Sequence, residues 1–357
     1  MQNPIDLKGY WWLPNLEENK LLGTLTYSQE GGASLEIVGV FGKDETPQVD
    51  QPIIIHGATQ QGKPITLYKC FNTHYPLTGV GESKYHVHVI FEGVQFDSEE
   101  KIKFNEIYGS YTDLDAWVDI YGFTIDNDYK DNKFVSNIRY EKPASQFFDI
   151  SNDFQAGIGF SSHGPNQSII QTEVKISQRA YLVIKSKKGA VSYDSLSTQL
   201  EIFSSLLQIA AQRIPYPTSI SGVSKENSQK REGQKPYYPE INIYYQPIES
   251  KPIQKEKLPQ EFLFTFRDLT SEQIIAWFTS FDKYKTVIYL YRSLFYSNRL
   301  FIDNKFLNIA QALESLHSIL FGSRTLPHEE FIAQKERALQ NVPTDLGEWV
   351  GTALNNA

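Results

Sequence analysis

The chain has 357 residues, a net charge of −8 at pH 7, 40% hydrophobic residues and 21% charged residues. This length suggests two or three domains of ordinary globular composition. The acidic balance argues against a protein that coats nucleic acid by bulk electrostatics, because phosphate binding needs clustered Lys and Arg. The single cysteine, Cys70, excludes an internal disulfide. Neither a signal peptide nor an apolar run of membrane-spanning length is recognisable, so we expect a cytoplasmic protein without membrane attachment.

The first 190 residues favour β-structure. Glu30-Gly31-Gly32 separates two strand-like runs and predicts a hairpin turn. Strands are expected at residues 21–27, 33–41, 52–56, 65–71, 85–91, 134–140 and 169–186. Many short strands at this spacing predict a sandwich or an open barrel.

Three tryptophans are candidate ligand-binding residues. Trp11 and Trp12 are adjacent in a strand-like run and point to opposite faces, so one could enter the core while the other stays accessible. An exposed indole could stack on a base, a sugar or a partner. Core packing and the covering of a strand edge are the favoured alternative. A binding groove would be lined by Trp11, Trp12 or Trp117.

After residue 190 the apolar spacing becomes helical. Apolar residues recur every three or four positions within 193–213, which predicts an amphipathic helix packed on the sheet. Polar residues 221–236 predict an exposed loop, with RNA contact as the less favoured alternative. Further elements are expected as strands at 241–246 and 262–266 and as helices at 271–284, 287–297, 301–320 and 327–340. The predicted fold class is α+β: a large β-rich N-terminal domain, mixed near its end, followed by a helical segment.

No motif predicts a metal ion or a cofactor. His86 and His88 share one face of a strand, but a metal site needs a third or fourth ligand, and none lies at a recognisable spacing. Residues 126–132 resemble the opening of a calcium loop, yet Asp131 and Asn137 stand where that loop needs Gly and Glu. The glycine-rich stretches complete neither a phosphate-binding loop nor a dinucleotide fingerprint.

The helix expected at 301–320 carries a polar pair beside its apolar stripe. The stripe consists of Leu307, Ala310, Leu313, Leu316 and Leu320. Glu314 and His317 are three residues apart and therefore neighbours on the helix surface. Such a pair can orient a general base or make a polar contact within a bundle, so Glu314 and His317 are the candidate catalytic residues.

A set of short apolar and aromatic stretches runs through the first third of the chain. It comprises Trp12-Leu-Pro14, Leu22-Gly-Thr-Leu25, Leu35-Glu-Ile-Val-Gly39, His56-Gly-Ala-Thr59, residues 62–67, Phe104-Asn-Glu-Ile107 and Leu114-Asp-Ala-Trp117. This set resembles the N-terminal domain of ApeA-type anti-phage proteins. Residues 306–317 resemble the first helix of the HEPN domain attached to that module, and residues 345–350 with 354–356 are similar to a later helix.

The resemblance implies abortive-infection defence. A sensor domain is expected over residues 1–300, β-rich to about residue 218 and mixed over 240–300, with HEPN-like helices over 301–357. HEPN domains cleave RNA without a metal, using an Arg followed by four to six residues and then His, commonly paired across a dimer. The His would assist attack by the RNA 2′-hydroxyl and the Arg would stabilise phosphate charge. The implied partners are a phage-derived trigger, expected to be a protein, RNA, and a second copy in a homodimer.

Arg324 and His328 depart from that motif. Three residues, one of them Pro327, separate them, and no other Arg has a His at the required distance. We therefore expect an incomplete HEPN domain that is inactive alone, which leaves enzyme status open. In a protein with a full HEPN domain, Glu314 and His317 are expected near its active groove.

The leading hypothesis is thus the sensor and regulatory portion of an ApeA-like anti-phage protein. The alternative is a non-enzymatic β-rich binding module that recognises a phage protein, a peptide or a glycan. An independent enzyme on the β-domain is disfavoured because the residues contain no recognisable catalytic set.

Overall fold

The computed structural model describes residues 2–41, 53–60, 62–76, 81–165, 174–227, 236–246, 255–296, 301–322, 328–343, 346–347 and 349–351. By their internal contacts the residues form two units. Unit 1 comprises residues 1–281 and 295–298, and unit 2 comprises residues 282–294 and 299–357.

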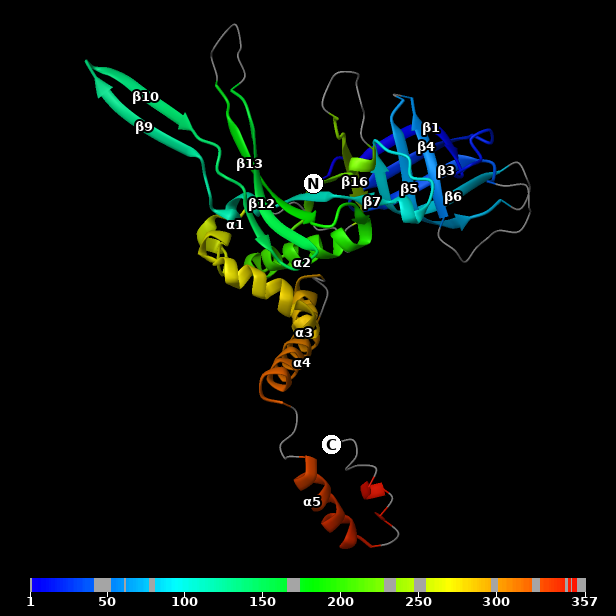
Figure 1. Ribbon diagram of the computed structural model, residues 1–357, viewed down its shortest axis with the longest axis vertical. Helices are drawn as coiled ribbons and strands as arrows, with labels where there is room; N and C mark the ends of the chain where they lie inside the picture. The colour runs from blue at the N-terminus through cyan, green and yellow to red at the C-terminus, as the bar shows by residue number, and fades with distance from the viewer. Residues whose placement is uncertain are drawn as a thin grey trace. The chain divides into compact units, whose positions relative to one another are not determined.

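Six strands of unit 1 close into an antiparallel barrel (Figure 1). They are β1 (Ile5–Trp12), β2 (Leu21–Ser28), β3 (Gly32–Val38), β4 (Ile53–Thr59), β5 (Pro64–His74) and β6 (Glu82–Glu92). Their order, β6-β3-β2-β1-β4-β5, returns to β6 because β5 also pairs with β6. The predicted β-rich part of an α+β protein is confirmed, and of the two alternatives, a sandwich or an open barrel, this part is a barrel, although a closed one. Closure depends on pairing between strands that are distant in sequence, which strand periodicity does not report.

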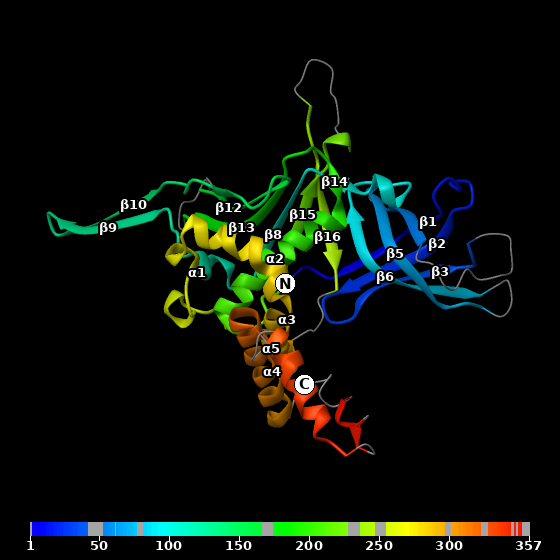
Figure 2. The same ribbon diagram turned by 60° about the horizontal axis from the view of Figure 1, so that its bottom comes forward.

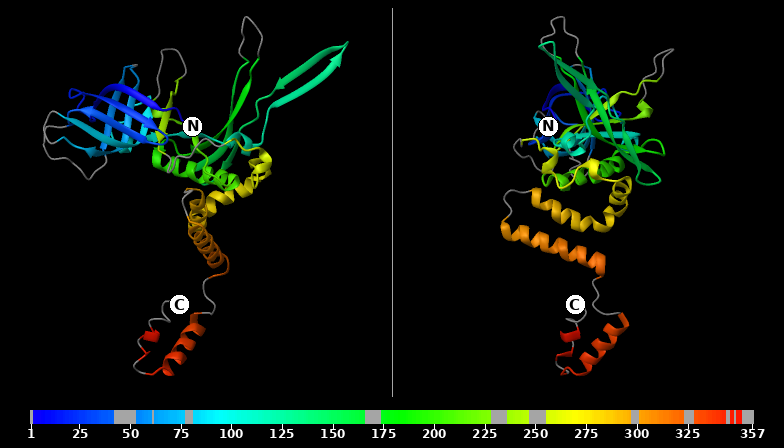
Figure 3. Two further views of the ribbon diagram at one scale, coloured as in Figure 1. Left: turned by 180° about the vertical axis from the view of Figure 1, so that it is seen from behind. Right: turned by 90° about the vertical axis from the view of Figure 1, so that its left-hand side faces the viewer.

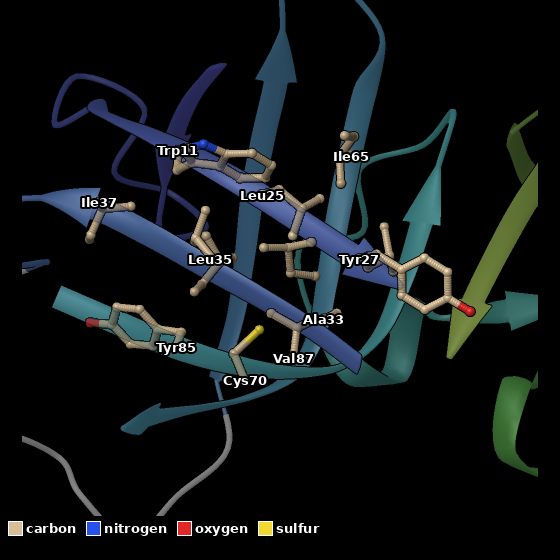
Figure 4. Close-up of a cluster of buried hydrophobic side chains, with 13 residues drawn as sticks. Trp11, Leu25, Tyr27, Ala33, Leu35, Ile37, Ile65, Cys70, Tyr85 and Val87 are labelled. Atoms are coloured by element: carbon tan, nitrogen blue, oxygen red, sulfur yellow. The ribbon is translucent and has the colours of Figure 1, made fainter. Parts of the chain in front are cut away.

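The barrel is filled by one cluster of inward side chains (Figure 4). Its members are Trp11, Leu25, Tyr27, Ala33, Leu35, Ile37, Ile55, Ile65, Leu67, Cys70, Tyr85, Val87 and Ile90. Along β2 and β3 they alternate with more exposed residues, as a sheet buried on one face requires.

Strand β6 passes from the barrel into a second antiparallel sheet. Residues 82–87 pair with β3, and residues 89–92 pair with β16 along the same edge. The second sheet continues in the order β16 (Glu240–Tyr245), β15 (Pro217–Val223), β8 (Glu106–Tyr111), β13 (Ser177–Ser186), β12 (Phe154–His163) and β11 (Gln146–Asp149). The two strand systems are therefore one continuous sheet.

Helix α2 (Tyr193–Ala211) covers one face of the second sheet and contacts β8 and β13 (Figure 2). The Ser192 hydroxyl accepts a hydrogen bond from the Ser195 amide, so it caps the helix start. Leu196, Leu200 and Phe203 are buried at helical spacing. The predicted amphipathic helix is confirmed.

An aromatic cluster joins the barrel to α2. Phe91 of β6 contacts Phe104 with ring centroids 5.6 Å apart, and it contacts Tyr193 at 5.1 Å. Phe104 belongs to β7 (Lys103–Phe104), which pairs with β14 (Val191–Ser192) directly before α2. The Tyr68 hydroxyl donates to a Glu99 oxygen at 2.6 Å in η1 (Glu99–Lys101). Burial and this carboxylate raise the pKa of Tyr68, so the hydroxyl remains a donor.

A separate hairpin consists of β9 (Phe123–Lys130) and β10 (Lys133–Tyr140), which pair with each other. It follows the short helix α1 (Leu114–Val118). Asp131 and Asn132, with φ of 51° and 63°, form its turn. The stretch that resembled a calcium loop is therefore the end of β9 and this turn. Asp and Asn suit it because they tolerate left-handed backbone better than other side chains.

Several predicted elements differ from the structure. Residues 262–266 form no strand: 262–265 lie between the short 3-10 helices η3 (Pro259–Glu261) and η4 (Phe266–Asp268), and Phe266 begins η4. The two helices expected at 271–284 and 287–297 are one, α3 (Ser271–Tyr296), because no Pro or Gly interrupts residues 284–287.

Three further predicted segments have other bounds in the structure. Glycine-rich residues 157–163 belong to strand β12, which pairs antiparallel with β13. Residues 221–223 extend β15 before η2 (Lys225–Asn227), and residues 228–235 of the expected loop lie outside the described residues. The strand expected at 169–186 begins at Ser177, and its first residues, to 173, lie outside the described part.

Unit 2 contains the end of α3, α4 (Ile302–Phe321) and α5 (His328–Gln340). The amide of Asn308 donates to the Ser293 hydroxyl at 2.9 Å, and Ala312 is buried. Leu313 and Leu320 of the predicted apolar stripe are 61% and 55% exposed, so they lie outside this contact. Among the described residues, no helix is both long and apolar enough to cross a membrane.

Candidate functional site: a polar cleft beside Asp113 and Arg213

A cleft of about 790 Å³ opens in the second-sheet part of unit 1. Its walls come from the end of β8, the start of α1, strands β12, β13 and β15, and residues 256–259. Eight of its lining residues bear a hydroxyl: Ser110, Tyr111, Thr112, Tyr121, Ser161, Tyr216, Thr218 and Ser219. Two Asp–Arg pairs also line the cleft, beside Glu256, Lys257 and several apolar residues.

The deeper pair joins Asp113 to Arg213. The Asp113 side chain is 1% exposed and the Arg213 side chain is 18% exposed. Arg213 Nε donates to Asp113 Oδ2 at 2.6 Å, and a second guanidinium nitrogen donates to Oδ1. The pair is therefore bidentate, which is the strongest geometry for an Arg–carboxylate interaction.

Asp113 also fixes the surrounding backbone. Its Oδ1 accepts the amide of Lys257 at 3.1 Å, and its carbonyl accepts the amide of Trp117 at 2.9 Å. Arg213 in turn donates to the carbonyl of Lys255 at 2.9 Å. One buried carboxylate thus holds together the start of α1, the chain after α2 and the segment at 255–257.

The second pair lies nearer to solvent. Arg179 of β13 donates to an Asp115 oxygen at 2.7 Å, with side chains 68% and 35% exposed. The other Asp115 oxygen accepts the amide of Ala180 at 2.6 Å. The Asp115 carboxylate raises the pKa of Arg179, so the guanidinium stays charged. An exposed paired Arg remains available to a ligand that offers acceptor oxygens.

The chemistry of this cleft suits binding better than catalysis. Its lining residues include hydroxyls, carboxylates and guanidinium groups but neither His nor Cys. The described lining residues therefore contain neither a Ser–His nor a Cys–His pair. Converging hydroxyls with a few charged groups can hydrogen-bond a polar ligand such as an extended peptide or a sugar.

The sequence did not predict this cleft. Asp113 precedes a short helix and reads as an ordinary helix start, while Arg213 lies 100 positions further along. Only the meeting of β8, α1 and the end of α2 brings the two together. The sequence pattern places glycan or peptide recognition on the tryptophans instead.

Trp11 and Trp12 are both buried in the barrel wall, which agrees with core packing, the favoured alternative. Trp11 is 0% exposed and Trp12 is 4% exposed. Trp11 points into the barrel (Figure 4). On the other face, the ammonium of Lys20 lies 4.5 Å from the Trp12 ring centroid, and the ring of His56 covers its edge. Stacking of the Trp12 ring on a ligand would require the side chains of Lys20 and His56 to move.

Trp117 lies next to the cleft without lining it. Its side chain is 0% exposed and packs against Phe266 with ring centroids 5.7 Å apart. Its neighbour Ala116 lines the cleft. Trp117 therefore belongs to the core behind the cleft, and its predicted ligand contact stays a prediction.

The histidine pair lies on the outer face of β6. The ring centroids of His86 and His88 are 5.2 Å apart, and Phe71 covers the ring of His88 at 5.4 Å. Burial first, then the charges of His86 and Lys69, lower the pKa of His88. Over the described ranges, no group of three or more His, Cys, Asp or Glu could hold a metal ion.

Glu314 and His317 lie on α4, and both are exposed. The His317 ring packs against Phe321 with centroids 5.0 Å apart. Arg324 lies outside the described residues, as does the side chain of His328, the first residue of α5. The structure thus brings no further described residue of the predicted site to Glu314 and His317, and their catalytic role stays a prediction.

The fold and cleft define an α+β protein with a barrel, a helix-covered second sheet and a polar pocket. A family model described as ApeA N-terminal domain 1 matches residues 6–277, well over half of the chain. The chain therefore belongs to this family, which is consistent with a role in anti-phage defence. No curated protein and no solved structure gives a significant match.

Two of the stretches that carried the resemblance are partners in the barrel. Trp12 is the register partner of His56, and Trp11 is that of Gly57, in the antiparallel pair of β1 and β4. In a third stretch, the Asn105 amide donates to the Val223 carbonyl at 2.8 Å and its side chain accepts the Lys225 amide. These stretches therefore specify packing and chain connection in the barrel and the second sheet.

Proposed function

We propose that this protein acts in anti-phage defence, with unit 1 as its sensor and regulatory part. The observation that carries the proposal is the family match over residues 6–277, which spans the barrel, the second sheet and the start of α3. The proposed trigger is a phage-derived protein. The cleft beside Asp113 and Arg213 supports this because it offers hydrogen-bonding and charged groups to an extended segment of such a protein.

The effector part of the proposal concerns the helices from residue 301 onward. We assign them to a HEPN-like domain, the kind of domain that cleaves RNA without a metal ion and commonly acts as a homodimer. The resemblance of residues 306–317 supports the assignment, as does the exposed position of Glu314 and His317. Both side chains can reach a ligand without rearrangement of the helix.

The sensing role is tested by blocking the cleft. Ser219 is exposed on β15 and lines the cleft, so Ser219→Trp should fill it without disturbing a core. We expect the variant to weaken trigger binding at least about tenfold, about 1.4 kcal/mol, and phage plating on cells that carry it to rise. Thr198→Trp, at an exposed position of α2 outside the cleft, is the matched control. Equal protection by both variants would refute trigger binding in the cleft.

The effector role is tested separately in the full-length native protein. Glu314→Gln combined with His317→Gln should lower infection-induced RNA cleavage and phage protection together, at unchanged protein level. These conservative changes at exposed positions should alter stability by no more than about 0.5 kcal/mol. Unchanged RNA cleavage and unchanged protection would remove both residues from the active groove.

A second candidate function is a non-enzymatic binding module for a peptide or a glycan. The hydroxyl-rich lining of the cleft favours it, because sugars and extended peptides are recognised through many hydrogen bonds. Pull-down from phage-infected and uninfected lysates separates the two. A trigger protein should appear only after infection, whereas a glycan ligand of the host should be captured from both.

A further inference from the structure

The β9–β10 hairpin has one apolar face that is open to solvent. Its antiparallel register pairs Phe123 with Tyr140, Ile125 with Ile138, Asn127 with Ser136, and Tyr129 with Phe134. Because side chains of alternate residues share a face, all four pairs lie on the same side. Views from several directions show the hairpin projecting from the remainder of unit 1 (Figure 3).

The exposure of this face is high for such large side chains. Ile125, Ile138, Tyr129 and Phe134 are 60%, 59%, 76% and 60% exposed. At about 200 Å² for a fully exposed large side chain, they present roughly 500 Å² of apolar surface. A patch of this size is at the upper end for a monomer and commonly marks an interface. A lone two-stranded hairpin is also marginal in water, so a covering partner would stabilise it.

The charge of the hairpin indicates the kind of partner. Between Phe123 and Tyr140, three acidic residues (Asp126, Asp128 and Asp131) balance three basic residues (Lys130, Lys133 and Arg139), so the segment is neutral while the chain carries −8. A neutral apolar face does not favour a nucleic acid, which requires positive charge. It also allows two identical surfaces to approach without the repulsion that the rest of an acidic chain would produce.

We propose that the apolar face of the β9–β10 hairpin binds the same face of a second copy of this chain. A two-fold arrangement uses the same patch twice, as symmetric dimers do. Two copies together would cover roughly 1,000 Å², the area at which a specific interface becomes credible. This proposal uses neither the cleft nor Glu314 and His317, and it differs from the homodimer of the effector proposal in the surface that pairs: the β9–β10 hairpin instead of the helices from residue 301 onward.

The base of the hairpin is held firmly enough to present this face. The Gln178 side chain of β13 accepts the amide of Gly122 at 3.0 Å and donates to the carbonyl of Ile120 at 2.8 Å. The amide of Glu141 donates to the carbonyl of Gly122 at 2.8 Å, closing the hairpin at its base. The rings of Phe123 and Tyr140 then stack at 4.7 Å.

Cross-linking of the whole chain tests the proposal directly. The only native cysteine, Cys70, is 0% exposed, so an added thiol would be the accessible one. Asn127→Cys places a thiol at the centre of the apolar face, and Asn137→Cys places one on the opposite face of the same hairpin. Packed sheets lie about 10 Å apart, so a bismaleimide of that reach should link two Asn127→Cys chains and should not link two Asn137→Cys chains.

The oligomeric state supplies the second measurement. Sedimentation velocity of the wild-type chain should show a dimer that dissociates on dilution. Ile125→Ser with Ile138→Ser should weaken the dimer at least about tenfold, since buried apolar anchors carry most interface energy. Asp126→Ser with Asn137→Ser, the paired positions on the polar face, should leave dissociation within about twofold.

The outcomes separate this interface from every other contact. A monomeric wild-type chain would overturn the proposal. So would a dimer whose dissociation the Ile125/Ile138 variant leaves unchanged, because such a dimer would use another surface. Equal cross-linking through Asn127→Cys and Asn137→Cys would also overturn it, since collision rather than a specific face would then explain the link.

Discussion

The indole ring of Trp11 lies directly on the backbone of Gly57. The two residues are register partners in β1 and β4, and a methyl group on Gly57 would overlap the six-membered part of the ring. The largest side chain in the barrel therefore has its place because its cross-strand partner has no side chain. A change of side chain at either residue therefore alters the packing of the other.

Gly57→Ala should destabilise the barrel by about 1–3 kcal/mol, the cost of overpacking a close-packed core. Trp11→Phe removes part of the ring and should relieve that overlap. The double variant should therefore be more stable than the sum of the single effects predicts. Urea unfolding of the four proteins measures the coupling. Strict additivity would show that the two residues do not share this contact.

Removing one member of the buried Asp113–Arg213 pair should be costly. Asp113→Asn keeps a side chain that tolerates the left-handed backbone at this position, where φ is 65°, but leaves Arg213 as an uncompensated charge. We expect a loss of about 3–5 kcal/mol in the free energy of unfolding.

The exposed pair provides the control for that experiment. Arg179→Gln breaks the contact with Asp115. Because the Arg179 side chain is 68% exposed, the free energy of unfolding should fall by no more than about 1 kcal/mol. Equal losses for Asp113→Asn and Arg179→Gln in urea unfolding would contradict the burial argument.

Stability should depend on pH through His88. Its pKa in the folded protein is lowered by burial and by His86 and Lys69, so the folded state binds its proton less tightly than the unfolded chain does. The contribution is therefore fully present above the unfolded pKa of about 6.5 and is lost as pH falls toward the lowered folded pKa. His88→Gln should make stability less sensitive to pH in this window. A pH dependence identical to wild type would exclude His88 as its source.

The docking of α3 on α2 should depend more on packing than on its hydrogen bond. Trp277 Nε1 donates to the Ile202 carbonyl at 2.9 Å, while Phe278 packs against Phe203 with ring centroids 5.5 Å apart. Trp277→Phe should cost about 1 kcal/mol and Phe278→Ala about 3–5 kcal/mol. Thermal unfolding monitored by tryptophan fluorescence shows which of the two variants loses more stability. A larger loss for Trp277→Phe would reverse this ranking.

Local patterns predicted the elements that depend on local properties. Alternating runs gave β2 and most of β6, and three-and-four spacing gave α2. The expected strand at 262–266 failed because apolar residues there pack as short turns under the second sheet. A run of apolar residues indicates that a segment will be buried, but it does not indicate which secondary structure the segment will adopt.

The amino-acid sequence by itself determined the β-rich first part, the helical last part and the resemblance that the family match over residues 6–277 supports. Tertiary structure decided that the barrel closes, that both Trp11 and Trp12 are buried, and that Asp113 meets Arg213. The physical reason is sequence distance. Closure requires β1 to pair with β4 and β3 to pair with β6 while β6 continues into β16, and the Asp113–Arg213 contact spans 100 positions. Such contacts follow from the balance of all pairings in the folded chain, which no single stretch encodes.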